Sequence, residues 1–576
     1  MNLKITPLII SILTITLGCK NETQKESNVL NVRIPREPDQ ANPVLSTTAI
    51  AAIVENLIFM PVYDYDPYNQ SSTSVLAESK PTIIKKGKST GFTIVLRKDA
   101  SWDDGTPVTA DDIAFTLKCI INPFLNTSGK NGVLFPLDSI DFTTQSKQFT
   151  LWTDDDYFLD LQAFTNNYIL QEKKYDSLSL LRKLSWTELK NMKGDSARTE
   201  SQKIAKTFAD QFTSPSFSRE KVTGCGPYSI TEWQTNQYIK LKRKQNWWGN
   251  KYADSIINFR QYPDEIVYRI IPEEANAVTA LKDGLLDVIA TDISPSMFKS
   301  MSKDSSFQNK LSFITGPSIR YVYFSLNNKS PLLADKHTRQ ALAHLLDLDQ
   351  LANNLFQGYA QRITVPFQPS KSYYDHDLVP IAYDTSEANK LLAMAGWKDS
   401  DHNGVLDKMI FGKKNDLVLR IYVTPGGLGQ QIAIHLQEQA RKVGIRLELL
   451  PKPLPFILDQ IQHHDFEIAA LSDSQYPGPD DPYPVWHSQA YKENGQNYSG
   501  FTNATADSLI DLIRHSDPGT IQTGLYTQLE KIIYEEQPAI FLFAPKNLII
   551  VNKKWDAKAA SARPGYFVND FKRIKI

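Results

Sequence analysis

The sequence has almost no net charge and no hydrophobic run long enough to cross a bilayer. Its 63 basic and 64 acidic residues leave a formal charge of −1 at pH 7. No basic field is therefore available to hold a phosphate backbone, and nucleic acid is not expected as a partner. The apolar run from Ile5 to Leu17 contains Pro7, Ser11 and Thr14, and it falls short of the roughly 20 residues that a membrane helix needs.

The short motifs of common catalytic sites are also missing. There is no His-Glu-x-x-His zinc helix, no Gly-x-Ser-x-Gly elbow and no Cys-x-x-Cys pair. His463 and His464 precede Asp465, but adjacent residues of a helix point in different directions, so a solvated helix end explains them better than a metal or acid-base cluster. We expect no enzyme activity, no cofactor and no metal.

No internal repeat of roughly 20 to 50 residues occurs, which argues against solenoids and propellers. A length of 576 residues exceeds the roughly 250 to 300 over which a single core keeps growing, so at least two lobes are expected. Hydrophobic residues make up 41% of the chain and charged residues 22%, as in soluble globular proteins.

The first residues have the pattern of an export signal. Lys4 precedes the apolar run, which ends at Gly18 and Cys19, and this order predicts a secretory leader over residues 1–18. A small residue followed by cysteine resembles a bacterial lipobox, although Thr16 stands where that pattern usually has leucine. The resemblance implies that Cys19 is lipidated and anchors the chain to a membrane of the cell envelope. Residues 19–28 are polar and predict a flexible tether.

Strands and helices alternate along the remaining chain, which predicts a mixed α/β fold. A strand is expected at Phe92 to Leu96, followed by a helix that Thr109 caps together with Asp112. Residues 171–215 favour a helical insertion on a lobe surface. Asp335 is expected to cap one helix that runs to Phe356 and stops at Gly358. Gly444 is expected to adopt a left-handed conformation before a strand from Ile445 to Leu450.

Two loops offer only part of a ligand motif. Gly426 to Gly429 lies between a predicted strand and a predicted helix, as a phosphate loop does, but Ile432 stands at the third glycine position and no lysine follows. Nucleotide binding is therefore not expected. Asp399, Asp401 and Asn403 alternate before Gly404, as in a calcium loop, but the twelfth position is Ile410. A surface turn is favoured, and a weak calcium site over residues 399–407 stays open.

Cys119 and Cys225 are the two cysteines beyond the leader. An oxidising compartment would permit them to form a disulfide, and two buried free thiols are the alternative.

The run from Phe92 to Lys118 resembles the signature of family 5 extracellular solute-binding proteins, the dipeptide and oligopeptide receptors of ABC importers. The positions that match the signature are Leu96-Arg97, Trp102, Asp104-Gly105-Thr106-Pro107, Ala110 and Asp112. Further segments match in the same order: Arg36-Glu37-Pro38, Gly224 to Tyr228 with Cys225 in place of threonine, Arg269 to Ile289, Arg339 to Leu342, Gly396-Trp397 and Asp481-Pro482. The resemblance covers roughly residues 29 to 555.

This resemblance implies two α/β lobes of the periplasmic-binding-protein type (type II, cluster C), with an extra subdomain inserted in lobe 1. Lobe 1 would comprise residues 29–60, 216–312 and 536–576, the subdomain 61–215, and lobe 2 residues 313–535. Closure of such lobes excludes water and strengthens main-chain hydrogen bonds to an extended peptide. The resemblance further implies a monomer that captures a short peptide or similar solute and delivers it to the permease subunits of an ABC transporter.

Carried over by position, the ligand site would include Ser46, Thr47 and Thr48 and the segment from Gly316 to Tyr323. Alternation along that strand is expected to leave only one of Tyr321 and Tyr323 facing the ligand, and we choose Tyr321. The family holds the ligand's ammonium with an aspartate, but here Gly478 stands at that position. Asp473 or Asp480 would serve instead, or the ligand lacks a free amine there. Tyr476 and Trp486 complete the predicted site.

Two other functions stay open at this stage. One is a receptor of the same fold for a non-peptide solute such as a sugar, a metal chelate or haem, which the displaced aspartate favours. The other is an envelope hydrolase that uses this fold.

Overall fold

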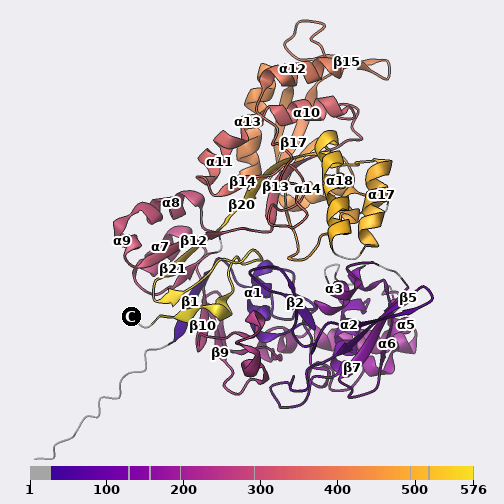
Figure 1. The fold of residues 1–576 in the computed structure, drawn as a ribbon, viewed down its shortest axis with the longest axis vertical. Coiled ribbons are helices and arrows are strands. Elements are labelled where there is room, and N and C mark those ends of the chain that lie inside the picture. Colours follow the sequence, from indigo (N-terminus) through magenta and orange to yellow (C-terminus); the bar gives the residue numbers. More distant parts are fainter. Residues whose placement is uncertain are drawn as a thin grey trace, which may run out of the picture.

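Two large β-sheets organise the chain, and each forms the centre of one lobe (Figure 1). The structure, a computed structural model, describes residues 28–574 except 128, 129, 131, 155, 156, 195, 291, 493, 494, 517 and 518. The expected leader, the expected lipidation site Cys19 and the expected tether up to residue 27 lie outside the described residues. The predicted mixed α/β class with two lobes is confirmed. Among the described residues, no helix combines the length and hydrophobicity needed to cross a membrane.

Lobe 1 is built on a seven-stranded sheet. Its central strand β1 pairs in parallel with β10 and β11, and the other pairs are antiparallel. The strand order is β12 (Leu311–Gly316), β21 (Asn547–Asn552), β11 (Val288–Ile289), β1 (Val29–Ile34), β10 (Glu265–Ile270), β9 (Tyr238–Arg243) and β8 (Tyr228–Gln234). Side chains of β21 alternate between two cores, because successive residues of a strand face opposite sides of the sheet. One core contains α1 (Ala49–Ile58), and the other contains α7 (Glu274–Lys282) and α8 (Pro295–Lys303).

A subdomain with its own antiparallel sheet joins lobe 1. Its strands are β4 (Thr82–Lys86), β5 (Ser89–Val95), β7 (Gln148–Thr153) and β6 (Leu137–Phe142). β5 confirms the predicted strand, and α2 (Ala110–Ile121) confirms the helix after Thr109, whose backbone N–H donates to Asp112 Oδ2 at 2.9 Å. Helices α4 (Glu172–Tyr175), α5 (Trp186–Lys190) and α6 (Glu200–Phe212) confirm that residues 171–215 are largely helical. The apolar core of this subdomain is continuous with that of lobe 1.

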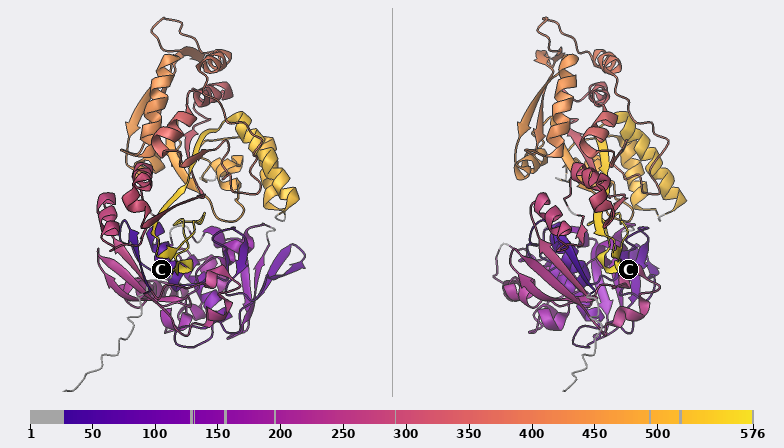
Figure 2. Two further views of the ribbon diagram at one scale, coloured as in Figure 1. Left: turned by 60° about the vertical axis from the view of Figure 1, so that its left-hand side comes forward. Right: turned by 90° about the vertical axis from the view of Figure 1, so that its left-hand side faces the viewer.

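Lobe 2 is built on a six-stranded sheet with helices on both faces (Figure 2). The strand order is β14 (Ala360–Arg362), β20 (Ala539–Pro545), β13 (Arg320–Leu326), β19 (Ile468–Ser474), β17 (Val418–Val423) and β18 (Arg446–Pro451). The core on one face takes side chains from α10 (Lys336–His344), α11 (Leu348–Phe356), α12 (Thr385–Met394) and α13 (Leu428–Lys442). The core on the other face takes side chains from α17 (Ala504–Arg514) and α18 (Thr520–Glu536).

The single helix expected from Asp335 to Phe356 is wrong, because two helices occupy this stretch. Asp335 does cap α10, but a second cap at Asp347 accepts a hydrogen bond from the Gln350 N–H at 2.9 Å and begins α11. An aspartate satisfies unpaired N–H groups better at a helix start than within a helix. The predicted stop is confirmed, since Gln357 and Gly358 both have left-handed φ angles of 55° and 87°.

Glycines at two other predicted sites have structural explanations. Gly444 has a φ of 79° and precedes β18, as expected. The Gly426 to Gly429 turn does join β17 to α13, but the Gly426 N–H donates to Gln430 Oε1 at 2.7 Å within the same turn. A Cβ at Gly429 would overlap Ala470 of β19. Close packing against Ala470 therefore explains why position 429 is glycine, and no bound phosphate is needed to explain it.

The acidic loop at residues 399–407 is a turn whose carboxylates have partners within the chain. Oxygens of Asp399, Asp401 and Asp407 lie within 4.8 Å of one another. Asp399 accepts hydrogen bonds from the Asn403 and Gly404 N–H groups, and Lys414 Nζ lies 2.5 Å from Asp401 and 3.5 Å from Asp407. The ammonium of Lys414 thus already pairs with two of the three carboxylates.

Cys119 and Cys225 are both buried and free. The structure thus shows the two buried thiols that were the alternative to a disulfide. Burial raises the pKa of Cys119 well above its ordinary value and that of Cys225 to about 12, so both stay protonated and poorly reactive.

The lobes are joined by two adjacent segments. The chain leaves lobe 1 after β12 and starts β13 of lobe 2 at Arg320, and it returns from β20 to β21 through Lys546 alone. The two segments meet, because Gly316 of β12 pairs with Asn547 of β21. Asn547 Nδ2 also donates to the carbonyls of Pro317 and Ala560, each at 2.8 Å. The two covalent connections between the lobes therefore run side by side, and a hydrogen-bonded strand pair holds them together.

The core of lobe 2 contains a fully buried carboxyl group at Glu530 of α18. Its Oε2 accepts a hydrogen bond from the Asp375 N–H at 2.8 Å. Burial raises the pKa of Glu530 from 4.5 to about 8, because the charged form loses its hydration. Between the lower pKa of the unfolded chain and about pH 8, Glu530 is therefore protonated in the folded protein and ionised in the unfolded chain.

We expect the Glu530→Gln variant to lose less stability in alkali than the parent protein. The contribution of protonated Glu530 is full below the unfolded pKa and is lost as pH rises through about 8. Glutamine keeps the shape of the acid and cannot ionise. The fall in unfolding free energy between about pH 5 and about pH 9 should shrink by on the order of 4 kcal/mol, measured by urea titration. Glu535→Gln, an exposed change on the same helix, should not alter it, and equal slopes for all three proteins would contradict the assignment.

Candidate ligand-binding site between the lobes

A cavity of about 150 Å³ lies where the loop 475–482 of lobe 2 approaches lobe 1. Its walls come from the end of α1, from β2 (Tyr63–Tyr65) and the turn after it, from Asn258, and from the C-terminal segment 560–567. Lobe 2 contributes Pro477. In Figure 1, α1 and β2 lie in the part of the lower lobe that faces the upper lobe. None of the eight predicted ligand residues lines this cavity, although Pro477 follows one of them, Tyr476.

The predicted hydroxyl residues of lobe 1 bond to lobe 1 itself. Ser46 is buried and donates to Glu55 Oε2 at 3.2 Å, while Thr47 and Thr48 donate to the Asp39 carboxylate at 2.9 and 2.7 Å. Thr48 also caps α1. Burial raises the pKa of Glu55 to about 7. These side chains build the turn that starts α1, so their hydroxyls are committed within the fold.

The expectation that strand alternation separates Tyr321 from Tyr323 is wrong. Residues two apart in a strand share a face, and the two rings lie 5.4 Å apart. Tyr321 is only 2% exposed, and its hydroxyl donates to Asp473 Oδ2 at 3.2 Å across β13 and β19. Tyr321 therefore positions the half-buried Asp473, and Tyr323 is the more exposed of the two rings.

Asp480 is committed to an internal ion pair. Its Oδ2 accepts a hydrogen bond from the Tyr373 hydroxyl at 2.6 Å and lies 3.5 Å from Lys371 Nζ. Lys371 is itself buried and donates to the carbonyls of Tyr476 and Gly478, which shapes the loop around the ammonium. Burial raises the pKa of Asp480 to about 6, although the lysine favours its charged form. Asp473 thus remains the accessible carboxylate of the two that the sequence singled out.

Gly478 lies against lobe 1. A Cβ at this position would overlap the hydroxyl of Tyr65 on β2, so the absence of a side chain allows the close approach of the two lobes. This contact gives a structural reason for glycine at the position where the family resemblance called for aspartate.

The two predicted aromatic residues lie in opposite environments. Trp486 is 4% exposed and packs against Phe501 and Phe541 in the core of lobe 2. Tyr476 is 77% exposed. His463 and His464 follow α14 (Leu454–Gln462), and the His464 ring packs on Tyr491. Among the described residues, neither histidine joins a cluster that could hold a metal.

A polar clamp across the lobes was missed by the sequence analysis. The Tyr157 hydroxyl of the subdomain donates to Asp481 Oδ2 at 2.8 Å, and Arg514 Nε of α17 lies 3.3 Å from the same oxygen. The Arg514 guanidinium lies 4.6 Å from the Tyr157 ring centre and 4.4 Å from that of Tyr483. No local pattern could have revealed the clamp, because Tyr157 and Asp481 are 324 residues apart in the chain.

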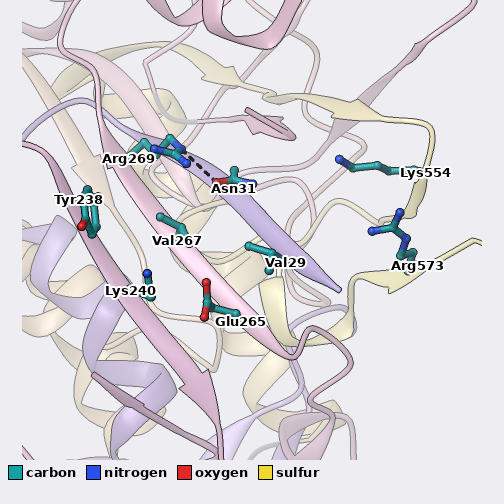
Figure 3. A pocket seen from close by; sticks show the side chains of 9 residues that line it. All are labelled: Val29, Asn31, Tyr238, Lys240, Glu265, Val267, Arg269, Lys554 and Arg573. Carbon is teal, nitrogen blue, oxygen red and sulfur yellow. Dashed lines mark hydrogen bonds between the residues drawn. The ribbon is translucent and has the colours of Figure 1, made fainter. Parts of the chain in front are cut away.

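A larger but shallower depression of about 580 Å³ lies on the outer face of the lobe 1 sheet (Figure 3). Arg269 donates to Asn31 Oδ1 at 3.0 Å there, beside Lys240 and Glu265 on the neighbouring strands. All of its lining residues belong to lobe 1. It is therefore separate from the contact between the lobes.

Two lobes joined by one strand pair, with a cavity and a clamp at their contact, define a bilobal solute-binding protein. Residues 73–497 match the model of bacterial extracellular solute-binding proteins, family 5 (middle). The chain belongs to this family.

Known proteins resemble the chain over most of its length. The oligopeptide-binding protein AppA of Bacillus subtilis is 27% identical over 521 residues, which are 89% of this chain and 85% of AppA. The periplasmic oligopeptide-binding protein OppA of Escherichia coli is 22% identical over 475 residues, 81% of this chain and 78% of OppA. Among solved structures, AppA in complex with a nonapeptide has a TM-score of 0.69 at 24% identity, covering 95% and 99% of the two chains. NikA from Brucella suis in complex with Fe(III)-EDTA has a TM-score of 0.73 at 17% identity, covering 95% and 100%.

We expect the Tyr157→Phe variant to release bound solute faster. The change removes one charge-assisted hydrogen bond between the lobes, so the closed form should lose stability and the dissociation rate should rise about tenfold, measured by tryptophan fluorescence after dilution. Tyr534→Phe is the matched control, because its hydroxyl donates at 2.7 Å to Val379 within lobe 2. Equal release from both variants and the parent would show that the clamp does not hold the lobes closed.

Proposed function

We propose that the chain captures a short peptide or peptide-like solute between its lobes and delivers it unchanged to the permease subunits of an ABC importer. The relationship to AppA over 89% of the chain carries the proposal, and the names of the other relatives also refer to peptides. The residue boundaries of lobe 1, the inserted subdomain and lobe 2 that the sequence predicts belong to this proposal. The proposal also holds that the protein is a monomer and binds its solute without catalysing a reaction. Closure would exclude water and strengthen hydrogen bonds to the peptide backbone.

Solutes other than peptides form the competing proposal. The fold is shared with NikA bound to Fe(III)-EDTA and with NikZ from Campylobacter jejuni bound to Ni(L-His), so the architecture accommodates metal chelates. The contact between Gly478 and Tyr65, which leaves no carboxylate at that position of the loop, favours keeping this alternative.

Native mass spectrometry of the purified protein distinguishes these proposals. We expect bound masses that fragment as peptides, and we expect peptides incubated with the protein to stay intact. A co-purified metal chelate, or cleavage of the peptides, would contradict the proposed function. Because a peptide that binds the folded protein and not the unfolded chain stabilises the folded state, an added peptide should also raise the melting temperature, and the rise should grow with peptide concentration.

Membrane anchoring through Cys19 in the cell envelope is part of the same proposal and has a separate test. We expect the protein to fractionate with membranes and to incorporate labelled palmitate, whereas Cys19→Ala should be soluble and unlabelled, because the substitution removes the thiol that would carry the proposed acyl anchor. Lys20→Ala, the adjacent residue of the expected tether, should behave like the parent. A membrane-bound, unlabelled Cys19→Ala variant would argue for another anchor.

A further inference from the structure

Residues that line the cavity at the lobe contact carry polar side-chain atoms without hydrogen-bond partners among the described residues. Asn56 Oδ1, Asn258 Oδ1, Ser561 Oγ and the Tyr566 hydroxyl belong to residues that line it, and each of these atoms is buried with no hydrogen-bond partner among the described residues. Ser561 and Tyr566 are each 3% exposed. A buried polar atom without a partner costs roughly 1 to 3 kcal/mol. The two amide oxygens can only accept hydrogen bonds and the two hydroxyls can accept or donate, so a ligand that carries donors would satisfy all four atoms.

A carboxylate without a cationic partner lines the same cavity. Asp64 of β2 accepts hydrogen bonds from the Tyr65 N–H at 2.8 Å and from Asn258 Nδ2 at 3.1 Å. Within the described part of the chain, no lysine, arginine or histidine forms an ion pair with it. Burial raises the pKa of Asp64 to about 6, so the group is charged at neutral pH and would be stabilised by a cation brought in with the solute.

The other charges near the cavity do not satisfy this need. Asp66 adds a second carboxylate, whose Oδ1 accepts hydrogen bonds from the Tyr68 and Asn69 N–H groups. Arg563 is the one basic residue in the lining, and its side chain is exposed, where water and salt screen its charge. Across the contact, Asp480 of lobe 2 is already paired with Lys371. The interior of the cavity is therefore rich in acceptors and negative.

We infer that this cavity is a subsite for a cationic group of the bound solute, such as a lysine side chain of a peptide, with Asp64 as its charge partner. That the solute is a peptide rests on the proposed function, and that its bound group is cationic rests on the residues that line the cavity. A cavity of about 150 Å³ holds a group of about six heavy atoms, the size of benzene, which accommodates the aminobutyl chain of lysine. Tyr65, Phe59 and Met60 of the lining would contact its methylenes.

Two matched peptide pools test the inference. Each pool contains alanine tri-, tetra- and pentapeptides with one substituted position, lysine in one pool and norleucine in the other, so that the pools differ by the ammonium. We expect the full-length protein to bind the lysine pool about tenfold more tightly, because a charge-assisted hydrogen bond is added. Asp64→Asn should reduce that preference to within about twofold while norleucine peptides still bind.

Control variants separate a loss of charge recognition from a loss of folding. Asp283→Asn removes the same charge from an exposed position of lobe 1 and should keep the lysine preference. Asn56→Asp adds a carboxylate at the cavity and should increase it, which provides a test even if Asp64→Asn does not fold. Equal binding of both pools by the parent protein, or an unchanged lysine preference in Asp64→Asn, would overturn the inference.

Failure of the proposed function gives a different result. If neither pool binds, peptides are not the solute, and 1,4-diaminobutane becomes the probe. Stabilisation of the parent but not of Asp64→Asn by this diamine would retain the cationic subsite without the peptide, and an equal melting temperature with and without diamine would overturn the subsite as well.

Discussion

The pairing of Gly316 with Asn547 is the constraint on which the arrangement of the lobes depends. Both connections between the lobes pass this point, and they are hydrogen bonded to each other rather than free. Ser318 Oγ adds a bond of 2.7 Å to the Pro545 carbonyl, and a Cβ at Gly316 would overlap Ala559 of the C-terminal segment. The lobes are thus held at one edge, and any opening must rotate about this joint, as in hinge closure.

Contacts between the lobes outside the joint are both apolar and polar. Phe158 of the subdomain packs against a core of lobe 2, and the Phe298 ring of lobe 1 lies 5.2 Å from the Tyr359 ring of lobe 2. The Tyr157, Asp481 and Arg514 clamp lies between the subdomain and lobe 2, and the Tyr65–Gly478 contact lies closer to the cavity. The polar contacts separate at a modest free-energy cost, because water replaces their hydrogen bonds. A solute that bridges the lobes can therefore decide whether they are closed.

Much of the fold could be predicted from the sequence, because the deciding interactions are local. The Thr109–Asp112 cap, the left-handed Gly358 and Gly444, and the helical stretch 171–215 each depend on neighbouring residues. The helix boundary at Asp347 also depends on neighbouring residues, but leucines at helical spacing on both sides of it favour the prediction of one continuous helix. The site was less accessible to prediction. Asp64, Asn258 and Ser561 meet only through the tertiary fold, and Ser46 and Trp486 show that a polar or aromatic residue at a matching position can serve the core instead.

The place of β21 in the lobe 1 sheet has a consequence for the order in which the protein can assemble. β21 separates β12 from β11, yet it comes near the end of the chain, whereas all six strands of the lobe 2 sheet lie between β13 and β20. Only Lys546 separates β21 from β20, which is an internal strand of the lobe 2 sheet, so a chain that emerges with its N-terminus first completes neither sheet until residues 539–552 have appeared. Until then the sheet of lobe 1 has an open gap and two unpaired edges, which a chaperone or a neighbouring chain could bind. Folding of lobe 1 must therefore await the last residues of the polypeptide.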